Sequence, residues 1–229
     1  MPKITVLVEG QTEETFVQSV LNPYILAVDP TAYIHPIVLV TKRVNSGEKW
    51  TGGLSKFRQL RDNVRLALQD TGAALVTCMI DLYRLPRDFP GYEAALNMQT
   101  ENKVTTLEHA LNEHISNSRF LPYISTHEFE ALLLSSPEAV VAAASLSATN
   151  SCNALSAFKG IASKFPSPEA INGVNPPSYR IKKIIPDYDK VRHGSIAAQN
   201  IGVDAMASKC EHFRGWVAAL KRVIAAQQR

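Results

Sequence analysis

Residues 4–14 read ITVLVEGQTEE, and this stretch decides the fold. Its first five residues are apolar or β-branched and predict a buried strand, with Glu9 at the C-terminal tip before Gly10 and a helix start. In open α/β sheets, ligands bind outside the carboxyl ends of the strands. We therefore interpret Glu9 as a site residue, whereas Glu13 and Glu14 are explained by the dipole of the helix that follows.

Further strands and helices alternate through the first half of the chain. Apolar runs at residues 34–40, 74–80 and 120–126 predict three more strands, and helical spacing of apolar residues predicts a helix over residues 101–117. Residues 50–53 predict a loop. Strands separated by helices favour an α/β fold with a mostly parallel, four-stranded sheet flanked by helices.

The composition changes after Ser135 and indicates two regions. Residues 1–135 are expected to form the α/β domain, and residues 136–229 a mainly helical C-terminal region packed on it. Ser136 and Ser167 each precede Pro and Glu, a pattern typical of helix starts. The last helix carries an apolar stripe that either packs internally or makes a dimer; its members are Met206, Cys210, Phe213, Val217, Leu220 and Ile224.

The bulk composition is that of an ordinary globular protein. The 229 residues are 45% hydrophobic, and the net charge of +3 is too small to identify a nucleic-acid-binding protein by itself. The three cysteines are scattered and indicate neither a zinc site nor a disulfide framework. No signal peptide or membrane-length apolar run is present, so we expect a cytoplasmic protein without membrane association.

Four acidic residues are candidates for one site. Asp81 follows the apolar run 74–80 as Glu9 follows the first strand, and Glu128 and Glu130 follow the run 120–126. Carboxylates gathered at strand ends repel one another unless a cation lies between them, and Mg²⁺ or Mn²⁺ is the expected ion. Such an ion can hold phosphate oxygens and activate water.

Each of these acids also has a structural interpretation. Asp81 could hydrogen-bond the amides of the loop that follows it. Of Glu128 and Glu130, one is expected to point to the site and the other to solvent or a salt bridge. His127 is interpreted as a structural histidine.

Basic residues gather in two places. Arg84 and Arg87 follow Asp81 and are expected to meet a phosphate. A second group lies beside Tyr179 and Tyr188 and consists of Arg180, Lys182, Lys183, Lys190 and His193. This group either tracks a nucleic-acid backbone or is a solvated surface loop, and both interpretations stay open.

An ordered set of short motifs resembles a known family. The motifs are VEGQTEE at 8–14, MIDLY at 79–83, HEFEALL at 127–133, YDK at 188–190 and CEHF at 210–213. Together they resemble a bacterial domain-of-unknown-function family of TOPRIM type, the four-two-seven-six family, over nearly the whole chain. The resemblance implies a TOPRIM-like, Rossmann-like fold, related to the TOPRIM domains of OLD-type nucleases, topoisomerases and primases.

The resemblance also implies roles for particular residues. Glu9 matches the glutamate that acts as acid/base or metal ligand in TOPRIM enzymes, and Asp81 matches the first acid of their Asp-x-Asp motif, which holds Mg²⁺. The second acid of that motif is Tyr83 here. The metal site then has one carboxylate fewer, unless Asp88 or an acid from the pair Glu128 and Glu130 substitutes.

Three functional hypotheses follow. The leading one is a Mg²⁺-dependent nuclease of a bacterial conflict or anti-phage system, with Glu9, Asp81, Glu128 and Glu130 as catalytic acids and the first three as metal ligands. The second is a catalytically inactive TOPRIM-fold sensor or regulatory partner of an ABC-class ATPase, as Tyr83 suggests. The third is a nucleotidyl-transfer role, for which no nucleotide-binding arrangement stands out.

Overall fold

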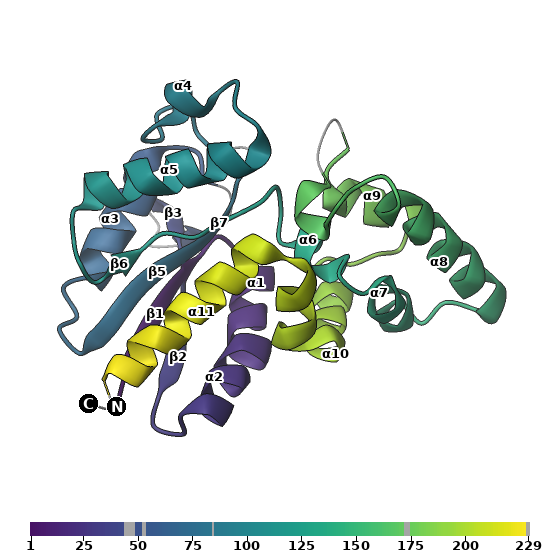
Figure 1. Ribbon diagram of the computed structural model, residues 1–229, viewed down its shortest axis with the longest axis horizontal. Coiled ribbons are helices and arrows are strands. Elements are labelled where there is room, and N and C mark those ends of the chain that lie inside the picture. Colours follow the sequence, from purple (N-terminus) through teal and green to yellow (C-terminus); the bar gives the residue numbers. More distant parts are fainter. Residues whose placement is uncertain (44–48, 52–53, 84, 172–174, 228–229) are drawn as a thin grey trace. The chain divides into compact units, whose positions relative to one another are not determined.

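The computed structural model describes residues 1–43, 49–51, 54–83, 85–171 and 175–227 (Figure 1). The chain divides into two compact units. The first unit comprises Met1–Ser125 together with Ala218–Arg229, and the second comprises Thr126–Val217. The first boundary lies ten residues before the change in composition at Ser135, because the segment after Ser125 packs with the helices of the second unit.

The first unit is built on a parallel sheet. Its strands are β1 (Lys3–Val8), β2 (Tyr33–Val38), β5 (Ala73–Asp81), β6 (Phe120–Leu121) and β7 (Ile124–Ser125). The strand order is β2-β1-β5-β6, β7 also pairs with β5, and each of these pairings is parallel. The predicted mostly parallel α/β sheet is therefore confirmed.

The predicted strand at 120–126 differs in detail. It forms two short strands, β6 and β7, which pair with different parts of β5. Pro122 lies between them and has no backbone N–H to donate to a neighbouring strand, which explains the interruption.

Helices cover the sheet of the first unit. They are α1 (Gln11–Phe16), the π-helical turn η1 (Val17–Leu21), α2 (Asn22–Val28), α3 (Phe57–Ala67), α4 (Tyr92–Ala95) and α5 (Thr100–Ile115). Figure 1 shows α3 and α5 on one side of the sheet, and α1, α2 and the C-terminal part of α11 (Glu211–Ala226) on the other. The predicted helix over 101–117 is confirmed as α5.

A small antiparallel pair joins this unit. It consists of β3 (Val40–Arg43) and β4 (Lys49–Thr51). The loop prediction for residues 50–53 is wrong for Trp50 and Thr51, which belong to β4, and Gly52 and Gly53 lie outside the described residues. The sequence of this pair carries no clear alternation of apolar and polar residues that would have indicated strands.

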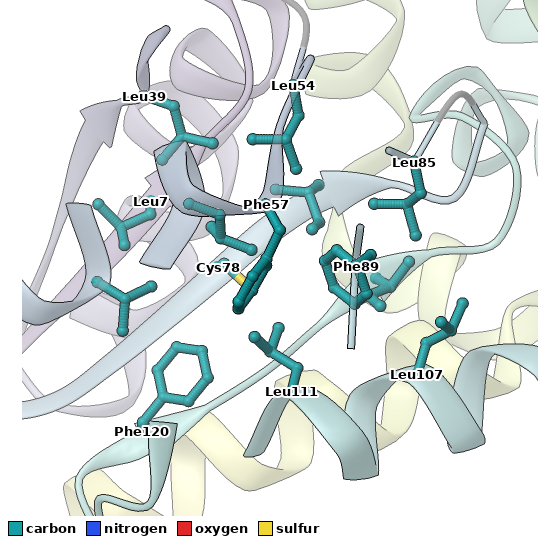
Figure 2. Packing of buried hydrophobic residues seen from close by; sticks show 14 of the residues in the cluster. Leu7, Leu39, Leu54, Phe57, Cys78, Leu85, Phe89, Leu107, Leu111 and Phe120 are labelled. Carbon is teal, nitrogen blue, oxygen red and sulfur yellow. The ribbon is translucent and has the colours of Figure 1, made fainter. Parts of the chain in front are cut away.

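The core on the α3–α5 side of the sheet is shown in Figure 2. Cys78 lies in the middle of β5 and packs in a cluster with side chains from α3 and α5 that include Phe57 and Leu111. The rings of Phe57 and Phe89 meet edge to face with centroids 5.5 Å apart. Burial raises the pKa of the Cys78 thiol to about 12, so this cysteine is a small buried hydrophobe, as the sequence indicates.

Arg119 fixes the connection between α3 and β5. Its guanidinium donates to the backbone oxygens of Leu68, Asp70 and Ala73 at 2.6, 2.8 and 2.9 Å. The first of these carbonyls lies at the C-terminal end of α3, where helix geometry leaves acceptors without partners, and the other two lie in the following turn and at the start of β5. One side chain thus orders the turn that leads into the central strand.

The second unit is mainly helical. Its elements are α6 (Glu130–Leu133), α7 (Pro137–Ala143), α8 (Ala148–Ala162), the 3₁₀ turn η2 (Pro168–Ala170), α9 (Pro177–Ile184), α10 (Arg192–Lys209) and the first part of α11. Ser136 and Ser167 stand directly before α7 and η2, which confirms both predicted helix starts. The apolar stripe expected on a single last helix is divided between two: Met206 lies in α10, Cys210 has extended backbone between the helices, and the members from Phe213 to Ile224 lie in α11. All six members are buried.

The described part of the chain contains no helix that is both long and apolar enough to cross a membrane.

Candidate functional site

Glu9 and Asp81 lie together at the carboxyl ends of two neighbouring strands. Val8, the last residue of β1, is in register with Met79 of β5. Glu9 directly follows β1, and Asp81 is the last residue of β5. The backbone N–H of Asp81 donates to Glu9 Oε2 at 3.3 Å. The structure therefore places these two acids, which are 72 residues apart in the sequence, at one position on the sheet edge.

The Glu9 carboxylate is held by backbone groups from two directions. Its Oε1 atom accepts the N–H of Leu54 at 3.3 Å, while Oε2 accepts that of Asp81. Asp81 belongs to the sheet and Leu54 to the segment before α3, so backbone groups from both segments orient the carboxylate. Such bonds fix the direction in which a carboxylate presents its remaining lone pairs.

The start of α1 lies directly beside Glu9. Gly10 is the extended residue before the helix, and Glu13 is buried in the first turn. A Cβ atom on Gly10 would come within 3.3 Å of Glu13 Oε2, so a larger residue would crowd this carboxylate. Glu13 and Glu14 occupy the first turn, as the helix-dipole interpretation requires.

The residue types present here are those that would hold a Mg²⁺ ion with most of its water. Mg²⁺ is commonly bound through one or two carboxylates, and waters and substrate phosphates complete its octahedron. Glu9 and Asp81 are the two acids that would supply such carboxylates here. Among the described residues, no group of three or more His, Cys, Asp or Glu side chains is arranged to hold a metal ion.

Asp88, a possible replacement for the second acid of Asp-x-Asp, has another role. Tyr83, which stands at the position of that acid, is 43% exposed. Asp88 Oδ1 accepts the backbone N–H of Phe57 at 3.0 Å, so Asp88 caps the first turn of α3. Arg87 is exposed in the same segment, and Arg84 lies outside the described residues.

Glu128 and Glu130 belong to the second unit, where each has a defined partner. Glu128 Oε2 accepts the backbone N–H of Ser178 in the first turn of α9 at 2.9 Å. Glu130 is fully buried, and Lys190 Nζ lies 3.2 Å from its Oε2. This salt bridge agrees with one of the two orientations expected for the pair. Their assignment as catalytic acids stays a prediction.

Burial decides the electrostatics of Glu130. Loss of solvent raises the pKa of this carboxyl to about 6, the charge of Lys190 opposes the shift, and the nearby Glu128 adds to it. A carboxyl with this pKa exchanges its proton near neutral pH, which is a property of many functional acids and also of structural ion pairs.

The burial of the Tyr188 hydroxyl is a feature that sequence reasoning missed. Its hydroxyl is buried and has no hydrogen-bond partner among the described residues. Burial raises the pKa of Tyr188, and Glu130 contributes through its charge. The YDK motif contains this tyrosine beside Lys190, but no local pattern indicates that its hydroxyl is buried.

The second basic group is divided between two settings in the second unit. Arg180, Lys182 and Lys183 lie on α9, where the two lysines are exposed. Lys190 instead pairs with Glu130, and His193 Nδ1 accepts the N–H of Asp189 at 3.0 Å. Within this group, the exposed cations are therefore Lys182 and Lys183 of α9, and Arg180 beside them is half-buried.

Comparison with known proteins gives one family and one similar structure. The C-terminal region of the Burkholderia pseudomallei OLD protein is similar, with a TM-score of 0.46 and 11% sequence identity over 96% of this chain and 99% of that one. No curated protein matches the chain. The model of the family described as "Domain of unknown function (DUF4276)" matches residues 8–221. Because this match covers most of the sequence and confirms the resemblance in the motifs, the chain belongs to the DUF4276 family.

Proposed function

We propose that this protein is a Mg²⁺-dependent enzyme that cleaves phosphodiester bonds, with a TOPRIM-like arrangement of its site in the first unit. The observation that supports it is the placement of Glu9 and Asp81 side by side at the ends of β1 and β5. The motif resemblance to TOPRIM enzymes, in which matching acids hold Mg²⁺, points in the same direction.

Each residue has a distinct task in this proposal. A bound Mg²⁺ would polarise a phosphate oxygen and activate a water molecule. Glu9, oriented by the N–H groups of Leu54 and Asp81, would hold the ion or move the proton of the attacking water. Asp81 would be the second ligand, and the exposed Arg87 would contact a phosphate oxygen of the substrate.

A cleavage assay tests the proposal. Purified protein is incubated with plasmid DNA and with RNA in Mg²⁺ or Mn²⁺, and EDTA is added to parallel samples. We expect cleavage that depends on the metal. Glu9→Gln and Asp81→Asn should each lower its rate by about 10–100-fold or more, the loss typical of changes at a metal site. Asp62→Asn, an equal charge change at an exposed residue of α3, should leave the rate unchanged. Cleavage that survives both site variants would remove these acids from the mechanism.

A non-catalytic role is the second candidate. Tyr83 replaces the second acid of the motif, and Asp88, the nearest acid in sequence that might substitute, caps α3 instead. On this proposal the protein is a sensor or regulatory partner of an ABC-class ATPase in a bacterial defence system. Calorimetry that detects no binding of Mg²⁺ or Mn²⁺ at millimolar concentrations, together with co-purification of such an ATPase, would favour this role over catalysis.

A further inference from the structure

A groove between two helices of the second unit has the lining of a ligand site. It lies between α8 and α9 and has a volume of about 810 Å³. Figure 1 shows the two helices side by side. Pockets for small molecules commonly measure about 300–1,000 Å³, so the α8–α9 groove is large enough for a ligand with several functional groups.

The α9 side of the groove carries positive charge in a fixed geometry. Arg180 Nε donates to the backbone oxygen of Asn175 at 2.7 Å, and its guanidinium lies 5.2 Å above the ring of Phe165. These two contacts hold a planar fork of donors in place. Lys183 lines the groove one turn further along, and among the described lining residues Asp187 is the single carboxylate. The charge of the lining therefore favours an anion.

Amide and aromatic groups complete the lining. Asn150 and Asn153 are three residues apart on α8, so both amides lie on the face that borders the groove. Tyr179 also lines the groove with 50% of its surface exposed, which leaves an aromatic face available for stacking. Apolar residues, including Ala154 and Ile184, form the rest of the wall.

The combination narrows the ligand class. A purely apolar ligand would leave the amides and the cations without partners, which is costly for groups removed from water. A metal cation is disfavoured by Arg180 and Lys183. A ligand with a phosphate, a flat ring and hydrogen-bonding edges matches the cations, the tyrosine and the amides together.

We propose that the α8–α9 groove binds a nucleotide unit, either as a free nucleotide or as part of a single-stranded nucleic acid. Arg180 and Lys183 contact the phosphate, Tyr179 stacks on the base, and Asn150 and Asn153 bond to its edges. The groove is formed by residues of the second unit, whereas Glu9 and Asp81 belong to the first. It does not require that the protein cleave its ligand.

Binding measured without metal tests this site independently of catalysis. The full chain is titrated in EDTA against fluorescein-labelled 12-nucleotide single-stranded DNA and RNA by anisotropy, and against nucleoside monophosphates by calorimetry. Binding of the oligonucleotides but not of the monophosphates assigns the groove to single strands. The opposite result assigns it to free nucleotides.

Variants locate the binding. Arg180→Gln combined with Lys183→Gln should weaken binding about tenfold or more, as expected for the loss of charge-assisted contacts. Tyr179→Ala should also weaken binding. Because Tyr179 is exposed, this substitution is not expected to disturb folding. Lys159→Gln is the matched control, because Lys159 is exposed on α8 and does not line the groove. Circular dichroism verifies that each variant is folded. Absence of binding by both ligand types, or equal binding by the groove variants and the control, would overturn the proposal.

Discussion

Glu169 Oε1 accepts the backbone N–H of Phe213 at 2.9 Å, so a carboxylate 44 residues earlier in the sequence caps the first turn of α11. Its Oε2 atom also accepts the N–H of His212 at 3.0 Å. Asp88 and Glu128 serve α3 and α9 in the same way. Three helices thus begin at a carboxylate from a distant segment, which satisfies amide groups that helix geometry leaves unbonded and complements the helix dipole.

Removal of the Glu169 carboxylate should destabilise the protein. Glu169 is buried, and Glu169→Ala leaves two amides of α11 without their acceptor, so we expect a loss of about 1–3 kcal/mol in the free energy of unfolding. Urea unfolding followed by the fluorescence of Trp216, which lies in α11, measures the change. Glu211→Gln at the same helix start is the control, because that side chain is 90% exposed. An equal effect of both variants would contradict the capping role.

Glu130 should make stability depend on pH between its unfolded and folded pKa values. The folded pKa is raised from 4.5 to about 6, so the native state binds more protons than the unfolded state in this window. The stabilisation is therefore complete below pH 4.5 and is lost as the pH rises through about 6. At about 1.4 kcal/mol per pKa unit, the loss is about 2 kcal/mol.

The variant Glu130→Gln tests this dependence, since its amide does not titrate. Unfolding free energies measured at several pH values from 4 to 7 should show a flatter profile for the variant than for the unmodified protein. Glu101→Gln, at an exposed position of α5, should retain the original slope. Parallel profiles for Glu130→Gln and the unmodified protein would show that Glu130 has an ordinary pKa in the folded state.

Arg119 should contribute strongly to the stability of the first unit. Its guanidinium serves three carbonyls around the end of α3, and Arg119→Met keeps an apolar stem but removes every donor. We expect a loss of about 2–3 kcal/mol, since hydrogen bonds to charged groups are stronger than neutral ones. Thermal unfolding with Arg65→Met as the control, an exposed arginine of α3, measures the difference. A melting temperature shared by both variants would argue against this role.

The sequence predicts the parts of this fold that depend on local patterns. Apolar runs identify β1 and β5, and the acid after each run identifies Glu9 and Asp81 as neighbours, because parallel strands end at one edge of a sheet. The caps are not predictable in this way. Glu128 and Ser178 are 50 residues apart, and Asp88 and Phe57 are 31 apart, so their pairing depends on tertiary packing that no short motif encodes.

Tyr83→Asp should strengthen metal binding if Glu9 and Asp81 hold the ion. The substitution restores the second acid of Asp-x-Asp, and Tyr83 is exposed enough that its replacement leaves the core intact. An added carboxylate ligand should tighten the affinity for Mg²⁺ or Mn²⁺ by about tenfold, which corresponds to about 1.4 kcal/mol. Calorimetry measures the change. The control is Tyr83→Asn, because asparagine has the size of aspartate without its charge. This variant should bind the ion as tightly as the unmodified protein does. Equal affinities of the Asp and Asn variants would show that no metal ion binds beside residue 83. That result would weaken the assignment of Asp81 as a ligand.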